Sequence, residues 1–132
     1  MEKENIAAKI IEMEKIALEK WNHGNPSGYL DIYSEHITYF DPFQEKRLDG
    51  LETMKKFYES LRGEITVDKY EMINPTVEVS YQSAVLSYNL ISYSGITTYK
   101  WNCTEVYQME NNSKWKIVHN HWSLTNPMND KF

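Results

Sequence analysis

The chain has 132 residues, of which 41% are hydrophobic and 25% charged, and its net charge is −5 at pH 7. These values are typical of one globular domain, and the lack of a basic run and of an apolar stretch of roughly 20 residues argues against a nucleic-acid-binding or membrane protein. The only cysteine, Cys103, excludes an internal disulfide and a multi-cysteine metal site.

The N-terminal segment predicts two helices. Residues 1–5 are charged rather than apolar, which argues against a secretory signal and makes the cytoplasm the expected location. Apolar residues then recur at spacings of four and three, as in an amphipathic helix: Ile6, Ile10, Met13, Ala17 and Trp21. Gly24 ends this helix, and Asn25 followed by Pro26 predicts a short second helix that runs to Tyr33.

A strand and a third helix follow. Residues 36–40 are rich in β-forming types and predict a first strand, closed by Asp41 and the proline after it. Beyond a polar loop, Asp49 and Glu52 have the spacing of a capping box, which predicts a helix that ends at Gly63.

The second half of the chain predicts only strands. From residue 65 onward β-branched and aromatic residues alternate with turn signals, and the expected strands lie near residues 65–73, 76–81, 84–93, 97–109 and 114–124. The two longest should lie at the centre of the sheet. Helices first and hairpin-linked strands afterwards predict the α+β class, with one domain over residues 1–132, a core at about 6–124 and a tail at 125–132.

The longest predicted strand gives the clearest indication of an aromatic wall. Strand alternation puts five residues on one side, and this set is the more aromatic one: Tyr99, Trp101, Cys103, Glu105 and Tyr107. We expect this side to be the concave face under the helices. There Glu105 would be a functional candidate or the partner of a His or Tyr, because an unpaired buried charge is costly. If the other set of alternating residues faces the helices instead, Glu105 is a solvated surface residue.

The chain is also rich in aromatic residues overall, with ten Tyr, four Trp and four Phe. Tyr and Trp combine an apolar body with a polar tip, so they suit a ligand pocket or an interface. An aromatic core is the simpler alternative.

Several short motifs, in this order, resemble the nuclear transport factor 2-like superfamily. They are Trp21-Asn22-x-Gly24, Tyr39-Phe40-Asp41-Pro42, Asp49-Gly50-Leu51, Thr104-Glu105-Val106-Tyr107 and Trp115 to Ser123. Within it, SnoaL-like and ketosteroid isomerase-like proteins and the association (hub) domain of calcium/calmodulin-dependent protein kinase II are the most similar. The resemblance implies a cone of three helices on a curved, mostly antiparallel sheet of about five to six strands, a central pocket, and a homodimer through the sheet. It implies no particular reaction, because the fold hosts both enzymes and non-catalytic modules.

Asp41 is the first catalytic candidate. The resemblance puts it where ketosteroid isomerases have their general-base aspartate, and desolvation beside aromatic rings would suit it to proton transfer. The alternative is a turn in which its side chain accepts a local backbone N–H. The oxyanion-hole positions of those isomerases correspond to Ala17 and Cys103, which cannot donate in the same way, so steroid isomerase activity is not predicted.

The hub resemblance also suggests which residues contact a ligand. Its ligand-contacting positions correspond to Tyr29, Met54, Leu90, Glu105 and Trp122, and the aromatic wall adds Trp101. None is positively charged, so a neutral or cationic, largely apolar or aromatic ligand is expected rather than an anion. For Tyr29, Met54 and Leu90 ordinary core packing is the alternative.

His119 and His121 lie two residues apart and share a face of the last strand. With Asp41 they would supply the ligands of a two-histidine, one-carboxylate metal site, but we expect a hydrogen-bonded structural pair or an acid–base role, with no metal and no other cofactor. The hub resemblance turns Trp122 inward and the histidines outward. A bulge could admit His121, which we keep as a second catalytic candidate.

Two functions stay open at this stage. One is a SnoaL-like small-molecule-binding protein, an isomerase- or lyase-type enzyme if Asp41 acts as a general base on a neutral apolar ligand. The other is a non-catalytic association module that dimerises through the outer face of its sheet. The sequence does not decide whether the protein is an enzyme.

Overall fold

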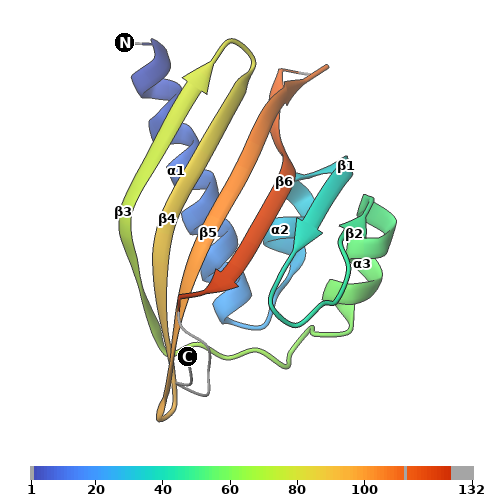
Figure 1. Ribbon diagram of the computed structural model, residues 1–132, viewed down its shortest axis with the longest axis vertical. Coiled ribbons are helices and arrows are strands. Elements are labelled where there is room, and N and C mark those ends of the chain that lie inside the picture. Colours follow the sequence, from blue (N-terminus) through green and yellow to red (C-terminus); the bar gives the residue numbers. More distant parts are fainter. Residues whose placement is uncertain (1, 112, 126–132) are drawn as a thin grey trace.

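The computed structural model describes residues 2–111 and 113–125, which form three helices on one face of a six-stranded sheet. The helices are α1 (Glu2–Asn22), α2 (Ser27–Ile32) and α3 (Leu51–Glu59). Figure 1 shows the twisted sheet in front, with α1 crossing behind β3 to β5 and the two shorter helices behind the other half. The predicted α+β class and helices-then-strands order are confirmed.

The sheet has the strand order β2-β1-β6-β5-β4-β3. Its strands are β1 (Tyr33–Phe40), β2 (Leu48–Asp49), β3 (Lys69–Ser80), β4 (Ser83–Ser94), β5 (Thr97–Glu110) and β6 (Lys114–Leu124). The predicted strands 97–109 and 114–124 are β5 and β6, and they lie at the centre as expected. All neighbouring pairs are antiparallel except β1 and β6, which run parallel.

Two predicted strands are one strand in the structure. Residues 69–80 run continuously as β3, and the register with β4 shifts between Ile73 and Thr76. Asn74 there has φ +49°, and Pro75 is tolerated because β3 is an edge strand that needs no donor on its outer side. The expected strand start at residue 65 is wrong, since residues 65–67 form an irregular segment that leads into β3.

Two helix starts, at α2 and at α3, were predicted from capping residues. At α2 the N-cap position is Pro26 and not Asn25 as predicted, although the side-chain oxygen of Asn25 accepts the backbone N–H of Ser27, the first helical residue, at 2.9 Å. At α3 the predicted capping box does not form. Asp49 instead lies in β2 and pairs with Arg47 at 2.6 Å, and Gly50 with φ +91° precedes the helix.

The core forms where α1 and α2 cover the middle of the sheet. Ile10, Ala17 and Leu18 of α1 are buried, as are Leu86 of β4 and Tyr107 of β5. Cys103, Glu105 and Tyr107 all face the helices, so the predicted phase of β5 is confirmed. Of the described helices, none combines the length and apolar character needed to cross a bilayer.

The end of α1 meets the end of α3 at two glycines. Gly24 has φ +81°, and its carbonyl accepts the N–H of Gly63 at 2.8 Å. A Cβ on Gly24 would lie 3.1 Å from the Cα of Gly63 and 3.3 Å from the carbonyl oxygen of Ile65. This contact fixes the loop that continues toward β3, so a side chain at Gly24 should strain it.

We predict that Gly24→Ala lowers the free energy of unfolding by about 2–3 kcal/mol, from positive φ and steric contact together. Gly63→Ala is the matched control, because Gly63 has φ +80° but a Cβ added there would have nothing within 4 Å. It should lose only about 1 kcal/mol. Urea denaturation measures both, and equal losses would contradict the close-approach argument.

Candidate functional site

A cavity of about 560 Å³ lies between the helices and the concave face of the sheet. Its size is within the range of small-molecule sites. The described residues that line it come from α1, α2, α3, β1, β4, β5, β6 and two loops: Leu18, Trp21, Asn22, Tyr29, Tyr39, Asp41, Phe43, Gln44, Phe57, Tyr58, Leu61, Glu64, Ile65, Thr66, Val67, Leu90, Ser92, Ser94, Tyr99, Trp101 and Trp122.

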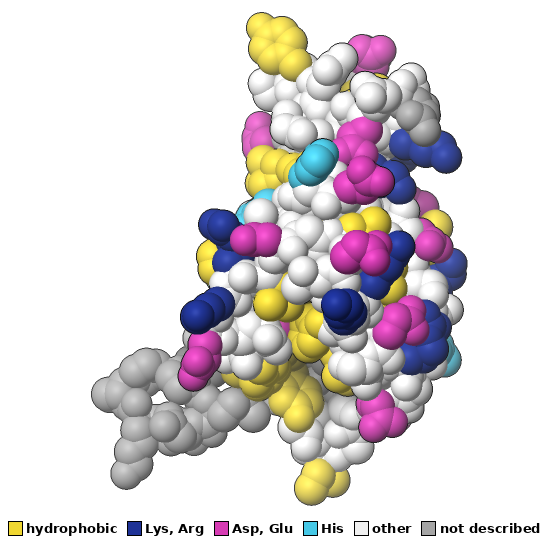
Figure 2. Space-filling view, turned by 90° about the vertical axis from the view of Figure 1, so that its right-hand side faces the viewer, with side chains coloured by type: hydrophobic (Ala, Val, Ile, Leu, Met, Phe, Trp, Pro, Cys, Tyr) yellow, Lys and Arg dark blue, Asp and Glu magenta, His cyan; other side chains and the backbone are white. Residues whose placement is uncertain are grey.

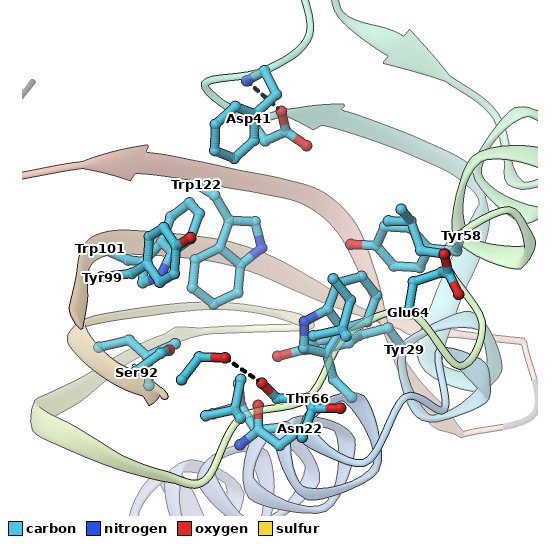
Figure 3. A pocket seen from close by; sticks show the side chains of 18 of the residues that line it. Asn22, Tyr29, Asp41, Tyr58, Glu64, Thr66, Ser92, Tyr99, Trp101 and Trp122 are labelled. Atoms are coloured by element: carbon cyan, nitrogen blue, oxygen red, sulfur yellow. Dashed lines mark hydrogen bonds between the residues drawn. The ribbon is translucent and has the colours of Figure 1, made fainter. Parts of the chain in front are cut away.

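Aromatic rings form two opposing walls of this cavity. We call Phe43, Tyr99, Trp101 and Trp122 the sheet-side wall, in which the Trp101 and Trp122 ring centroids lie 5.9 Å apart. We call Trp21, Tyr29, Tyr39, Phe57 and Tyr58 the helix-side wall. Figure 3 shows Tyr99, Trp101 and Trp122 on one side of the hollow and Tyr29 and Tyr58 on the other. A guest between the walls would contact rings on both sides.

Asp41 connects the two walls at one end of the cavity. Its Oδ2 accepts the hydroxyl of Tyr39 at 2.9 Å, and its Oδ1 accepts the backbone N–H of Phe43 at 2.7 Å. The local turn and the pocket position, which the sequence presents as alternatives, thus occur together. Asp41 is half-buried, and Figure 3 shows it above the hollow.

The charged side chains that line the cavity are all acidic. Asp41 and Glu64 are acidic, and among the described residues of the lining none is Lys, Arg or His. Neither carboxylate takes part in a salt bridge within residues 2–111 and 113–125. The cavity therefore offers no counter-charge to an anionic guest.

The cavity wall is partly open to solvent. Phe43 is 66% exposed although its ring contacts Trp101, with centroids 6.2 Å apart. Figure 2 shows hydrophobic side chains gathered in the lower part of the face that carries β1, β2 and α3, with acidic and basic side chains mainly above and beside them. A guest could enter past such an apolar rim.

The structure brings together most, but not all, of the residues predicted for the site. Tyr29, Asp41, Leu90, Trp101 and Trp122 line the cavity. Met54 and Glu105 are fully buried and do not belong to its described lining, so their predicted ligand contact is corrected. Met54 of α3 packs in the hydrophobic core. Glu105 of β5 lies next to Glu14 of α1.

The prediction of His121 as a second catalytic residue is also corrected. In β6 the register pairs Trp122 with Cys103 and His121 with Thr104, so Trp122 faces inward and His121 outward, where its ring lies 5.0 Å from that of Phe40. The register shift between β5 and β6 falls before His119 and does not reverse this alternation. His121 therefore does not reach the cavity.

His119 shares this outer face. Its Nδ1 is 2.7 Å from the Thr38 hydroxyl, and desolvation, followed by the nearby His121, lowers its pKa. The structure does not group Asp41, His119 and His121 as metal ligands. Within the described chain the only group of three or more His, Cys, Asp or Glu side chains with ligand atoms within 4.8 Å of one another is Glu14, Cys103 and Glu105.

Those three residues belong to a buried polar cluster behind Tyr29. Glu14 of α1 accepts hydroxyls from Tyr29 at 2.8 Å and from Tyr88, and the Tyr107 hydroxyl lies 3.5 Å from it. Glu105 of β5 accepts from Tyr107 at 3.0 Å and lies 3.7 Å from the Cys103 sulfur. Tyr29 thus joins this cluster to the cavity wall.

The two buried carboxyl groups share one environment and cannot both be ionised cheaply. Burial, and then the charge of Glu14, raise the pKa of Glu105 well above its usual range. Because Glu105 also has Glu14 as a hydrogen-bond partner, we assign a proton to Glu105. A metal ion would have to displace that proton and break these hydrogen bonds.

Glu14 is not among the residues predicted from the sequence, although a signal was present. It lies four residues after Ile10 and four before Leu18, on the apolar stripe of α1. A charged residue at such a position requires a buried partner.

Comparison with known proteins places this geometry in a family. Residues 6–126 match the calcium/calmodulin dependent protein kinase II association domain family. Among solved structures, a putative ketosteroid isomerase from Parabacteroides distasonis has 36% sequence identity and a TM-score of 0.81, over 90% of this chain and 87% of that one. A comparison with curated proteins found no match.

Two more distant structures share the fold. An NTF2-like protein of unknown function from Pseudomonas putida has 19% identity and a TM-score of 0.82, covering 94% of this chain and 89% of that one. The S. rosetta CaMKII hub has 20% identity and a TM-score of 0.72, covering 88% of this chain and 94% of that one.

The raised pKa of Glu105 predicts that stability falls as pH rises. Below the usual carboxyl range Glu105 is protonated in both the folded and unfolded chain. Above it, the unfolded chain releases this proton and the folded one retains it, so the free energy of unfolding falls by up to about 1.4 kcal/mol per pH unit until the folded pKa is passed.

Glu105→Gln should flatten this slope between pH 5 and 8, because Gln does not titrate and keeps an acceptor for Tyr107. Glu78→Gln, at an exposed position of β3, is the control and should leave the slope unchanged. Urea denaturation across this pH range measures it. Parallel profiles for wild type and Glu105→Gln would contradict the assignment of the proton.

Proposed function

The chain belongs to the calcium/calmodulin dependent protein kinase II association domain family, and from this premise we propose that it binds a small, largely apolar molecule in its cavity. Asp41 acts on that molecule as a general base. The fold alone does not select this function, since the superfamily's fold hosts several. The proposal therefore depends on the site.

One observation carries the proposal: a carboxylate held at the end of an aromatic cavity by two neutral donors. The Tyr39 hydroxyl and the Phe43 N–H orient Asp41 without cancelling its charge. A base positioned in this way can reach a guest lying between the walls, and positioned bases commonly contribute about 10²- to 10⁴-fold to a reaction rate. The 36% identity to a putative ketosteroid isomerase supports a proton-transfer function.

The reaction that suits this arrangement is removal of a proton next to a carbonyl group. The Asp41 carboxylate takes the proton, the C–H bond breaks, and its electron pair moves to the carbonyl oxygen to give an enolate. Ala17 and Cys103, at the isomerase oxyanion positions, do not line the cavity. Donation to the enolate in the manner of steroid isomerases is therefore not available, and a smaller, more acidic ketone is the better substrate class.

We predict that the protein catalyses deuterium incorporation at the α-carbons of 2-indanone in D₂O, a small neutral ketone whose α-hydrogens are also benzylic and therefore acidic. Asp41→Asn should reduce this rate about 100-fold, because the amide cannot accept the proton. Its Oδ1 still accepts the N–H of Phe43, so the melting temperature should change little. NMR follows the exchange.

Asp31→Asn, at an exposed position of α2, controls for general loss of charge. Equal exchange rates for wild type and Asp41→Asn would contradict the base assignment. A large drop in melting temperature for Asp41→Asn would instead favour a structural role for Asp41 in its turn.

A second candidate function, self-association, is favoured by the outer face of the central strands. Its middle is a patch without Asp, Glu, Lys or Arg on β4, β5 and β6: Val85, Ser87, Asn89, Asn102, Thr104, Val106, His119, His121 and Ser123. Uncharged sheet faces suit isologous pairing with a second copy. The association-domain match over residues 6–126 supports the same interpretation.

We predict a homodimer at micromolar concentration that Thr104→Glu dissociates, because two like charges would face each other near the symmetry axis of the patch. Gln82→Glu, in the exposed turn between β3 and β4, adds the same charge elsewhere and should leave the dimer intact. Sedimentation equilibrium measures both. A monomeric wild type would contradict this function without affecting the pocket.

A further inference from the structure

The cavity lining also indicates the charge of the ligand, a step that rests on the proposed small-molecule function. We propose that the cavity binds an organic cation: a quaternary ammonium group on an apolar or aromatic body. Three features of the cavity carry it.

The first feature is the number and arrangement of aromatic rings. Nine aromatic side chains, three of them Trp, line a cavity of about 560 Å³, and they are divided between its two walls. No ring contact joins the two walls among the described residues, so opposing ring faces remain for a guest. Ring faces carry negative potential and attract cations, most strongly for Trp, and cages of this kind hold quaternary ammonium groups.

The second feature is the uncompensated negative charge. Asp41 has two hydrogen-bond donors, and both are neutral. Tyr39 stays neutral because burial, with the nearby Tyr58 and Asp41, raises its pKa. Glu64 adds a second acid to the lining, and the described lining has no basic residue. A cationic guest would supply the missing counter-charge as well as fill the apolar volume, so a positive charge on the guest should add to its affinity.

The third feature is the position of the acid relative to the rings. Asp41 is hydrogen-bonded to Tyr39 of the helix-side wall and to the backbone of Phe43 of the sheet-side wall. An ammonium group beside Asp41 would therefore lie between the two walls, as Figure 3 shows for the hollow below this residue. The apolar body would extend toward Leu18 and Leu90, which also line the cavity.

A pair of isosteric probes tests the charge. Phenyltrimethylammonium and tert-butylbenzene have nearly the same shape and differ in a positive charge. Trp21, Trp101 and Trp122 line the cavity, so intrinsic tryptophan fluorescence reports its occupancy. We expect phenyltrimethylammonium to bind about tenfold more tightly at a fixed ionic strength.

Two variants assign the effect to the site. Asp41→Asn should weaken phenyltrimethylammonium binding about fivefold or more and leave tert-butylbenzene binding unchanged, and circular dichroism checks that it folds. Asp31→Asn removes an acid outside the cavity and should alter neither affinity.

Each outcome bears on a different claim. Equal affinities, or tighter binding of tert-butylbenzene, would overturn the cation proposal and leave the small-molecule function standing. Equal effects of Asp41→Asn and Asp31→Asn on phenyltrimethylammonium would also overturn it, because the attraction would then come from overall charge. If neither probe binds, the cation proposal fails, and the small-molecule function fails with it only if the ketone exchange is also not catalysed.

Discussion

The alternation of side chains along β5 is the constraint on which the rest of the structure depends. Every second residue from Tyr99 to Tyr107 faces the helices, so one strand supplies both the cavity wall and the core. Tyr99 and Trp101, at the open end, border a hollow. Cys103, Glu105 and Tyr107, further along, are buried against α1. A register slip of one residue would turn all of them outward and remove both features.

The two halves of this inner face support each other through Tyr29. Its ring belongs to the cavity wall, and its hydroxyl donates to Glu14 in the buried cluster. Within the described residues, no buried side-chain nitrogen or oxygen lacks a hydrogen-bond partner. Satisfied buried networks restrict the positions of their members, so the cluster fixes a ring against which a ligand would rest. Through Tyr29, the buried pair Glu14 and Glu105, whose burial costs free energy, therefore holds part of the cavity wall in place.

The sequence predicted those parts of the molecule that depend on local pattern. Period-two alternation and aromatic content predict the inward side of β5, and the hub resemblance predicts the inward orientation of Trp122. The Glu14–Glu105 pair could not be predicted from either residue alone, since it joins a helix and a strand 91 residues apart in sequence. The predicted ligand contacts of Met54 and Glu105 come from the hub resemblance, and a matched position does not distinguish a cavity wall from a filled core.

The central claim is that the aromatic side of β5 encloses a ligand cavity beside Asp41. A crystal structure of the protein with phenyltrimethylammonium tests it most directly. We expect electron density between Trp101 and Tyr58, with the ammonium group nearest the Asp41 carboxylate. Trp101 and Trp122 packed against the helix-side rings with no space between them, or buried between two subunits, would contradict it.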